Sequence, residues 1–155
     1  MVYNLVMASL LYNKKIHFNY EIRETFSAGI QLRGFEVKAL KTKKGGSLDG
    51  SHIIIQKGEA YLIGAHIPPY QSANTPTDYD SRQSRKLLLT KKELNKILVA
   101  HQTKGLTIVP ISMYNKHNKI KVDIAIARGK KKYDKRETIK KRDTERDIAR
   151  EVKNR

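Results

Sequence analysis

The chain has 155 residues, of which 39% are hydrophobic, which suffices for one modest core and argues against two full domains. Its 32 Lys and Arg outnumber 15 Asp and Glu, and the resulting net charge of +17 predicts a polyanionic partner. The absence of cysteine excludes disulfides and cysteine-based metal sites. No apolar run approaches the roughly 18 residues of a membrane span. We therefore expect a cytoplasmic protein with no membrane partner.

The N-terminal part begins with an apolar segment and continues into a predicted strand. Residues 1–12, MVYNLVMASLLY, form an N-terminal extension that lacks the basic region of a secretory signal. In residues 18–32, Phe18, Tyr20 and Ile22 alternate with polar residues. This pattern predicts a long strand, with a bend or bulge at Gly29.

A short helix, a hairpin and a long loop are predicted next. The apolar residues of FEVKALK, which follows Gly34, lie close to helical spacing, and the glycines of residues 41–50 end that helix. Residues 51–67 contain two β-rich runs around Lys57-Gly58, a turn dipeptide typical of a hairpin. Residues 68–84 hold three of the four prolines and predict a long loop, and such loops often carry function.

The clearest helical signal lies in the second half of the chain. Thr90 and Glu93 form a capping box, apolar residues recur with helical spacing from Leu94, and Gly105 is placed to end the helix. Two runs of β-forming residues then flank NKHN, which predicts a second hairpin over residues 106–129.

This order of elements predicts a mainly β fold with flanking helices. Several short antiparallel strands with a helix before the final hairpin are typical of a small barrel related to the oligonucleotide-binding (OB) fold, a common host of nucleic acid. We assign residues 13–128 to an OB-like RNA-binding barrel. Residues 129–155, called the basic tail below, follow the last strand.

Catalysis is not supported by the pattern of titratable residues. The five histidines are scattered, without the spacing that organises a metal ion or a general base. His101 lies on the apolar stripe of the predicted helix, where a packing role is favoured. Asp78 and Asp80 are better explained as turn formers than as metal ligands. We expect no enzyme activity, no metal and no cofactor.

Phosphate binding suits the end of the chain far better. Residues 128–155 contain thirteen Lys and Arg against six Asp and Glu. Arg128 and the run Lys130, Lys131, Lys132 leave the last strand in extended form, so that successive side chains can reach different phosphates. Tyr133 follows the run directly, where an aromatic ring can stack on a base. These features favour RNA over a solvated charge run.

The basic tail also has the residue pattern of a helix. Asp134 can cap it with Glu137 at the third position, and Glu137 can pair with Lys141 one turn later. A helix of this length without an apolar stripe is marginal in water. The tail is therefore predicted to be largely disordered alone and helical on a polyanion.

Several segments together resemble one known family. AGIQLRGFEVKAL, GAHIPPY, RKLLL, KGLTIVP and ARGKKKYDKRETIKKRD occur in the order found in small protein B (SmpB), the SsrA-binding partner of transfer-messenger RNA. The resemblance covers about residues 13 to 145. It implies an OB-type barrel that holds the tRNA-like domain of transfer-messenger RNA and a tail that enters the vacant mRNA path of a stalled ribosome. Elongation factor Tu would join the delivered complex.

The resemblance also assigns individual residues. It implies contact with transfer-messenger RNA by Asn13, Lys14, Glu36 and Lys38, together with Arg128, Lys130, Lys131 and Lys132. It places Tyr133, Asp134, Lys135, Arg136, Lys140, Lys141 and Arg142 in the decoding region and mRNA channel, and makes Gly129 the hinge of the tail. For Glu36, a helix-capping or ion-pair role is the alternative.

The chain departs from the family where a His commonly precedes an acidic residue and Tyr: it has Phe18, Asn19 and Tyr20 there. Two other readings stay open. One is a constitutive ribosomal or ribosome-assembly RNA-binding protein. The other is a basic nuclease, for which Asp78 or Asp80 would be needed.

Overall fold

The computed structural model describes residues 9–154 and every side chain in that range except those of residues 132–134. Most of the predicted N-terminal extension, residues 1–8, lies outside the described residues. The elements in chain order are β1 (Leu11–Tyr12), α2 (Ile16–Asn19), β2 (Tyr20–Ile30), α3 (Gly34–Lys41), β3 (His52–Gln56), β4 (Glu59–Ile63), the 3-10 turn η1 (Ser72–Asn74), β5 (Arg85–Leu88), α4 (Lys91–Gln102), β6 (Leu106–Lys116), β7 (Lys119–Gly129) and α5 (Lys132–Lys153).

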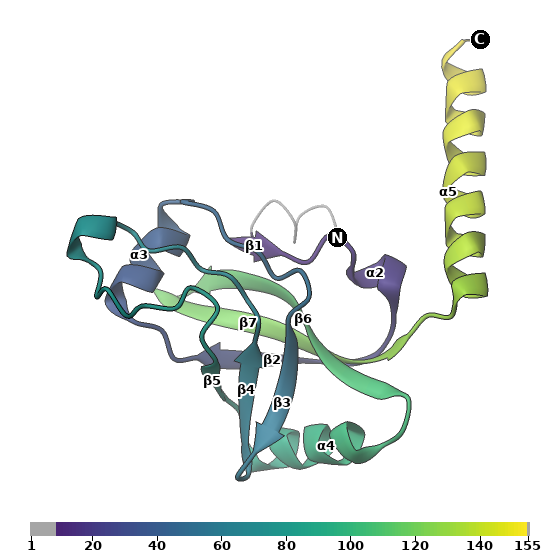
Figure 1. The fold of residues 1–155 in the computed structure, drawn as a ribbon. Helices are drawn as coiled ribbons and strands as arrows, with labels where there is room; N and C mark the ends of the chain where they lie inside the picture. The colour runs from purple at the N-terminus through teal and green to yellow at the C-terminus, as the bar shows by residue number, and fades with distance from the viewer. Residues whose placement is uncertain (1–8, 155) are drawn as a thin grey trace.

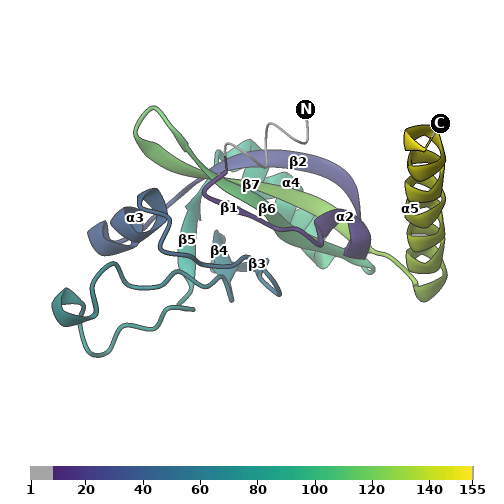
Figure 2. The ribbon, with the colours of Figure 1, turned by 90° about the horizontal axis from the view of Figure 1, so that it is seen from above.

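The strands form one seven-stranded antiparallel sheet in the order β1-β6-β7-β2-β5-β4-β3 (Figure 1). The sheet curls, so that its edge strand β3 packs near β6 although no ladder between these two strands is present among the described residues. The result is a barrel-like sheet that is not closed by hydrogen bonds. Helices flank it, which confirms the predicted fold class. Figure 2 shows α4 on one side of the long strands, with α3 and α5 toward opposite ends.

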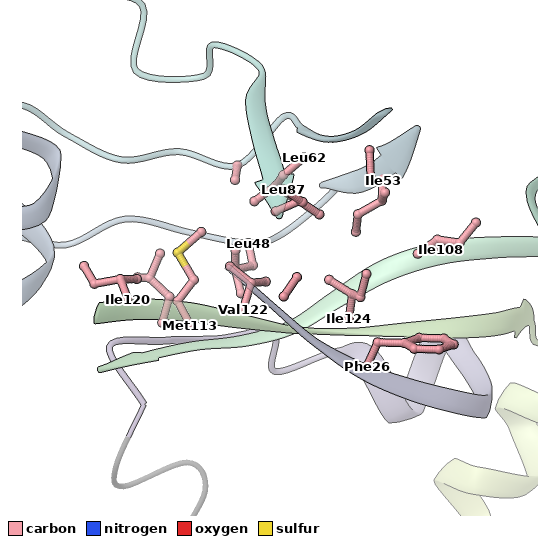
Figure 3. Close-up of a cluster of buried hydrophobic side chains, with 14 of the residues drawn as sticks. Phe26, Leu48, Ile53, Leu62, Leu87, Ile108, Met113, Ile120, Val122 and Ile124 are labelled. Atoms are coloured by element: carbon pink, nitrogen blue, oxygen red, sulfur yellow. The ribbon is translucent and has the colours of Figure 1, made fainter. Parts of the chain in front are cut away.

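The main core fills the space inside the curl. Side chains from β3, β4 and β5 face those of β6 and β7 across it, with Leu62 and Leu87 opposite Val122 and Ile124 (Figure 3). These four side chains are at most 3% exposed. Alternate residues of each strand reach this interior because side chains of a strand point to opposite faces in turn.

Both predicted hairpins are present, and their turns explain the residues found there. Lys57 and Gly58 have φ of 51° and 75°, and His117 and Asn118 have φ of 51° and 62°. Two successive residues with positive φ suit the right-handed twist of the flanking strands. His117 is thus a turn residue. The capping box of α4 is confirmed, since the Glu93 amide donates to Thr90 Oγ1 at 3.3 Å.

The sequence-based account of β2 needs two corrections. The strand begins at Tyr20, because residues 16–19 form the helical turn α2. The register shift lies between Ile22 and Glu24, not at Gly29. Gly29 pairs with Lys121 of β7 on one edge of β2 and with Leu88 of β5 on the other, and a Cβ there would lie 3.2 Å from the Leu88 Cβ. The glycine serves a close approach between strands.

Three elements and one side chain were missed or misplaced. The strands β1 and β5 and the turn α2 are too short to show a period in the sequence. Leu11 and Tyr12 pair with β6, so the ordered sheet starts inside the predicted N-terminal extension. His101 is exposed in the last turn of α4 and does not pack, because Ile97 and Ala100 fill the buried face.

Candidate nucleic-acid interface

Glu36 is a buried member of an ion pair. Its side chain is 1% exposed, and Arg85 Nε donates to its Oε2 at 2.6 Å. The Arg33 amide donates to the other oxygen at 2.9 Å and so caps the N-terminus of α3. The carboxylate therefore has the capping and ion-pair role that was the alternative in the sequence analysis. In this conformation it is not available for direct contact with RNA.

Arg85 connects α3 to the predicted loop 68–84. Its guanidinium donates to the carbonyl oxygens of Ala65, Ser81 and Gln83 at 2.8, 2.9 and 3.2 Å, in addition to its bond with Glu36. An Arg fork that is saturated in this way fixes the surrounding backbone. Arg85 thus holds both ends of the segment that carries Tyr70 and Tyr79.

Tyr79 completes this buried group. Its hydroxyl lies 2.7 Å from the Ile67 carbonyl and 3.2 Å from Glu36 Oε2, and its ring meets Phe35 edge-on with centroids 4.8 Å apart. Burial, followed by the charge of Glu36, raises the pKa of Tyr79. The phenol consequently stays protonated and able to donate beyond the usual pH range.

Asn13, which directly follows β1, is also buried and hydrogen-bonded to the protein backbone. It is 7% exposed, and its side-chain amide donates to the Pro110 carbonyl at 3.1 Å. Its backbone amide donates to Ile111 at 2.8 Å. Asn13 therefore fixes β1 on β6, and the neighbouring Lys14 is left exposed.

Four exposed lysines and one half-buried tyrosine lie beside these supports and form what we call the α3 patch: Lys14, Lys38, Lys43, Lys44 and Tyr70. The ammonium groups of Lys38 and Lys44 lie 6.0 and 5.7 Å from the centroid of the Tyr70 ring. Lys14 and Lys43 line one hollow of about 560 Å³ between β1 and the loop after α3. Cations beside an aromatic ring suit a nucleic-acid backbone and its bases.

The α3 patch contains two predicted RNA-binding residues, Lys14 and Lys38, and three that the sequence analysis did not single out. Lys43 and Lys44 were read only as the end of a helix, and Tyr70 only as part of a loop. A signal was present, since the lysine-rich run KTKK begins at the last residue of α3 and Tyr70 is the one aromatic residue in the first half of the loop 68–84. Only the fold brings the two segments together.

A second group of cations lies where β7 ends. Arg128 donates to Glu21 at 3.3 Å, while the Lys130 amide donates to the Asn19 carbonyl at 2.8 Å and its ammonium to Thr138 at 3.3 Å. Lys131 is exposed. The side chains of Lys132, Tyr133 and Asp134 lie outside the described part of the structure, so their assignments stay predictions.

Gly129 is the last residue of β7 and pairs with Tyr20. Its φ is not in the left-handed region, and among the described residues no atom lies within 4 Å of a Cβ built on it. The chain leaves the sheet through Lys130 and Lys131, which join β7 to α5. In this conformation the backbone at Gly129 does not require glycine, and its role as the hinge of the tail stays a prediction.

Helix α5 carries the remaining predicted cations. Arg136, Lys140, Lys141 and Arg142 are exposed, and Lys135 is partly buried. The helix stands at the end of the molecule opposite α3 in both views (Figures 1 and 2). The structure thus separates the predicted RNA-binding residues into two basic regions, the α3 patch and the basic tail.

Neither a membrane span nor a metal site is indicated in the described part of the chain. Within residues 9–154, no helix is long and apolar enough to cross a membrane. Within the same range, no three His, Asp or Glu side chains are grouped as metal ligands would be. Asp80 accepts from the Arg82 amide at 2.9 Å, the turn-forming role expected of it.

An open, curled antiparallel sheet with a basic aromatic patch at one end and a cationic helix at the other defines a class of β-rich RNA-binding proteins. Comparisons with known proteins make the assignment more specific. The family model described as SmpB protein matches residues 10–154. The chain therefore belongs to the SmpB family, which confirms the resemblance seen in the sequence.

Individual relatives agree with this assignment. The SsrA-binding protein of Gloeothece citriformis is 47% identical over 141 residues, which cover 91% of this chain and 90% of that protein. The SsrA-binding protein of Burkholderia vietnamiensis is 44% identical over 142 residues, or 92% and 95% of the two chains. A solved structure described as "tmRNA-SmpB: a journey to the center of the bacterial ribosome" has a chain with TM-score 0.63 and 41% identity, covering 78% of this chain and 84% of that one.

Proposed function

We propose that the protein binds the tRNA-like domain of transfer-messenger RNA and delivers it to stalled ribosomes for trans-translation. The observation that carries this proposal, beside the family, is the separation of two basic regions at opposite ends of one rigid sheet. A single region would suffice for an unspecific polyanion binder. Two separated regions allow one RNA to be held while a second is tested.

We assign the α3 patch to transfer-messenger RNA. Lys14, Lys38, Lys43 and Lys44 supply charge for phosphates, and Tyr70 supplies a ring on which a base can stack. Asn13 and Glu36 act indirectly, since they hold β1 and α3 in place beneath these side chains. This assignment gives direct contact to Lys14 and Lys38 and a supporting role to Asn13 and Glu36. The other predicted contacts with transfer-messenger RNA lie outside the α3 patch, at Arg128, Lys130, Lys131 and Lys132, and the test below asks whether the three lysines are needed.

We assign the basic tail to the ribosome. A ribosome that stalls without an mRNA codon offers no base pair to read, and a charged segment can instead test whether the mRNA path is vacant. Phosphate contacts would then stabilise the tail's helix in place. By family resemblance, elongation factor Tu would join the delivered complex, and the protein would make and break no covalent bond itself. This activity would place it in the cytoplasm.

The test is a binding measurement across a range of salt, with a transcript of the tRNA-like domain as ligand and an ordinary tRNA as competitor. Three proteins are compared: the full chain, a chain ending at Gly129, and the double variant Lys38→Ala/Lys44→Ala. The variant Lys91→Ala/Lys92→Ala is the matched control, because it removes the same charge from exposed positions on α4.

We expect the chain ending at Gly129 to keep its affinity and its preference over tRNA. The Lys38/Lys44 variant should lose affinity and lower the slope of log affinity against log salt by about 1 to 2, since each phosphate contact contributes roughly 0.7 to 0.9. Equal loss in the α4 control, or complete loss on removal of the tail, would contradict the assignment of the α3 patch. Presence of the protein on all ribosomes of growing cells would favour the ribosomal-protein alternative.

A further inference from the structure

One carboxylate on the outer face of the sheet, the face turned away from the core, is held by hydroxyl groups. Val122 and Ile124 of β7 point into the core (Figure 3), so Asp123 between them lies on the outer face. The Tyr114 hydroxyl of β6 donates to Asp123 Oδ1 at 3.0 Å. Ser27 Oγ of β2 lies 2.6 Å from the same hydroxyl. Three strands therefore fix the position of this carboxylate.

The directions of these hydrogen bonds leave the carboxylate able to accept more. Because the Tyr114 hydroxyl gives its one proton to Asp123, Ser27 is the donor in its own contact with Tyr114. Burial is the largest cause that raises the pKa of Tyr114, so the phenol keeps this proton at neutral pH. An ionised carboxylate has about four acceptor positions, and Tyr114 uses one. The half-buried Asp123 thus presents both oxygens to a further donor.

Asp123 differs in its partners from the other carboxylates on the described strands. Each of those has a cation at 3.3, 3.2 or 2.8 Å: Glu21 has Arg128, Glu24 has Lys96, and Glu59 has Lys86. Within the described part of the chain, Asp123 belongs to no ion pair. A negative charge without a cation repels phosphate, and it weakens the binding of RNA unless it accepts a hydrogen bond from that RNA.

The outer face that carries Asp123 borders helix α3. Lys121 is two residues before Asp123, so the two residues share this face and lie about 7 Å apart along β7. A hollow of about 260 Å³ lies between Lys121 and Val37 of α3, and Val37 is followed by Lys38 of the α3 patch. Asp123 is therefore within reach of an RNA that is bound at α3.

We propose that Asp123 binds an unpaired guanine of the tRNA-like domain and that Tyr114 is the residue that positions its carboxylate. The Watson–Crick edge of guanine offers two adjacent donors, the N1 imino and the N2 amino groups, and the two oxygens of a carboxylate can accept from both. No other standard base has two donors on this edge. In a base pair the edge is occupied, so the contact selects a base in a loop. This inference rests on the proposed function and deepens it, since it adds recognition of a base to the binding of phosphates.

The test uses the full chain and synthetic transcripts of the tRNA-like domain in which one unpaired guanosine at a time is replaced by inosine. Inosine lacks only the N2 amino group. For the wild type, we expect the replacement at one position to weaken binding about tenfold, as loss of a specific base contact does. At every other position the affinity should stay nearly unchanged.

The variant Asp123→Asn keeps the shape of the side chain and an oxygen for the bond from Tyr114. Its amide presents donors to the donors of guanine, so it should bind the unmodified transcript about tenfold less tightly and lose nothing further on the inosine transcript. Tyr114→Phe should bind the inosine transcript as the wild type does and lose part of the preference for guanine. Unchanged preference in Tyr114→Phe would overturn its positioning role.

The sign of the effect separates base recognition from charge alone. Loss of a negative charge by itself strengthens the binding of RNA, because repulsion of the phosphates falls. The matched control is Asp78→Asn, which removes the same charge from an exposed loop position and should bind equally or slightly more tightly. If Asp123→Asn behaves like this control, or if the wild type tolerates inosine at every unpaired position, the binding of guanine by Asp123 is overturned.

The inosine series of the wild type needs no variant, so it decides the question even if Asp123→Asn folds poorly. A failure of the proposed function would look different. The wild type would then bind the transcript no better than an ordinary tRNA, and the sign of the Asp123→Asn effect on either RNA would still decide the role of Asp123.

Discussion

At the scale of single residues, charge in the interior is concentrated in Glu36 and Arg85, whose side chains are each 1% exposed. Removal of one partner leaves the other as a buried, unpaired charge. We expect Arg85→Ala to lower the free energy of unfolding by about 3 to 5 kcal/mol, measured by urea denaturation. Lys86→Ala is the control, since it breaks the neighbouring exposed pair with Glu59, and it should leave the unfolding midpoint nearly unchanged. Equal effects of both variants would contradict the structural role of Arg85.

Tyr79 should make the stability of the protein depend on pH in the alkaline range, through its contacts with Glu36 and Arg85. Its folded pKa is raised above the ordinary value of about 10, first by burial and then by Glu36. The neutral phenol is the stabilised form, so its contribution is complete below the unfolded pKa and is lost as the pH rises through the folded pKa. Tyr79→Phe should remove one late-titrating component from the absorbance of tyrosinate and flatten the fall of stability above pH 10. Loss of a component with the ordinary pKa of tyrosine, in place of a late-titrating one, would show that Tyr79 is solvated.

At the scale of elements, Gly46 and Gly129 differ in whether the local backbone conformation requires glycine. Gly46 has φ of 122°, and a Cβ there would lie 2.8 Å from the His66 carbonyl oxygen, whereas Gly129 is extended and open. Gly46→Ala should lower the free energy of unfolding by about 1 to 3 kcal/mol. Gly129→Ala should change it by no more than about 0.5 kcal/mol and leave delivery of RNA intact. Loss of activity in Gly129→Ala with unchanged stability would support the predicted hinge at that glycine.

Helix α5 is expected to be unstable when it is separated from the rest of the protein. Its ion pairs contribute only about 0.2 to 0.5 kcal/mol each, and the side chains described in it form no buried apolar stripe. A peptide of residues 130–154 should therefore give a mostly unordered circular dichroism spectrum in dilute buffer and become helical when RNA is added. A stable helix in buffer alone would contradict this expectation.

Elements with a repeated signal could be predicted from the sequence, and those defined by distant partners could not. The capping box of α4 and the turn at Lys57-Gly58 are local, so their residues suffice to place them. The strand β5 is only Arg85–Leu88, and it is defined by its pairing with β4 on one edge and with β2, at Gly29, on the other. The burial of Glu36 follows from Arg85, which is far away in the sequence. No local pattern distinguishes such a carboxylate from an exposed one.

At the scale of the whole molecule, the sheet and the basic tail are separable. In the described chain the hydrophobic clusters end at Ala127, so α5 adds no apolar burial to the core. A chain ending at Gly129 should melt in one cooperative transition within about 5 °C of the full chain, because each kcal/mol shifts a domain of this size by only a few degrees. A fall in melting temperature much beyond that would mean that the tail contributes to the fold.

Some residues of the candidate site could be predicted from the sequence, and others could not. The positions of Lys14 and Lys38 could be anticipated because the family's motifs carry them. Lys43, Lys44 and Tyr70 meet only through the curl of the sheet and the loop that Arg85 holds, and charge counts in the sequence gave the amount of positive charge without its separation into two regions. The ring of Phe18 lies 5.9 Å from the Lys135 ammonium and 5.7 Å from the Arg142 guanidinium, and no pattern in the sequence predicts that these residues are neighbours.

The pairing of β1 and β2 with the final hairpin has a consequence for synthesis. Leu11 pairs with Met113, and Tyr20 with Gly129, so the strands made first find their partners in the strands made last. A nascent chain that has not yet released β7 can form the hairpin of β3 and β4 and the helix α4, but it leaves one edge of β2 and the inner face of the sheet uncovered. Such contacts between distant parts of a chain form slowly, and the incomplete sheet is open to aggregation. The sheet that positions the candidate interface can therefore be complete only after β7 has been made, and a ribosome that stops before β7 produces a fragment with an incomplete sheet.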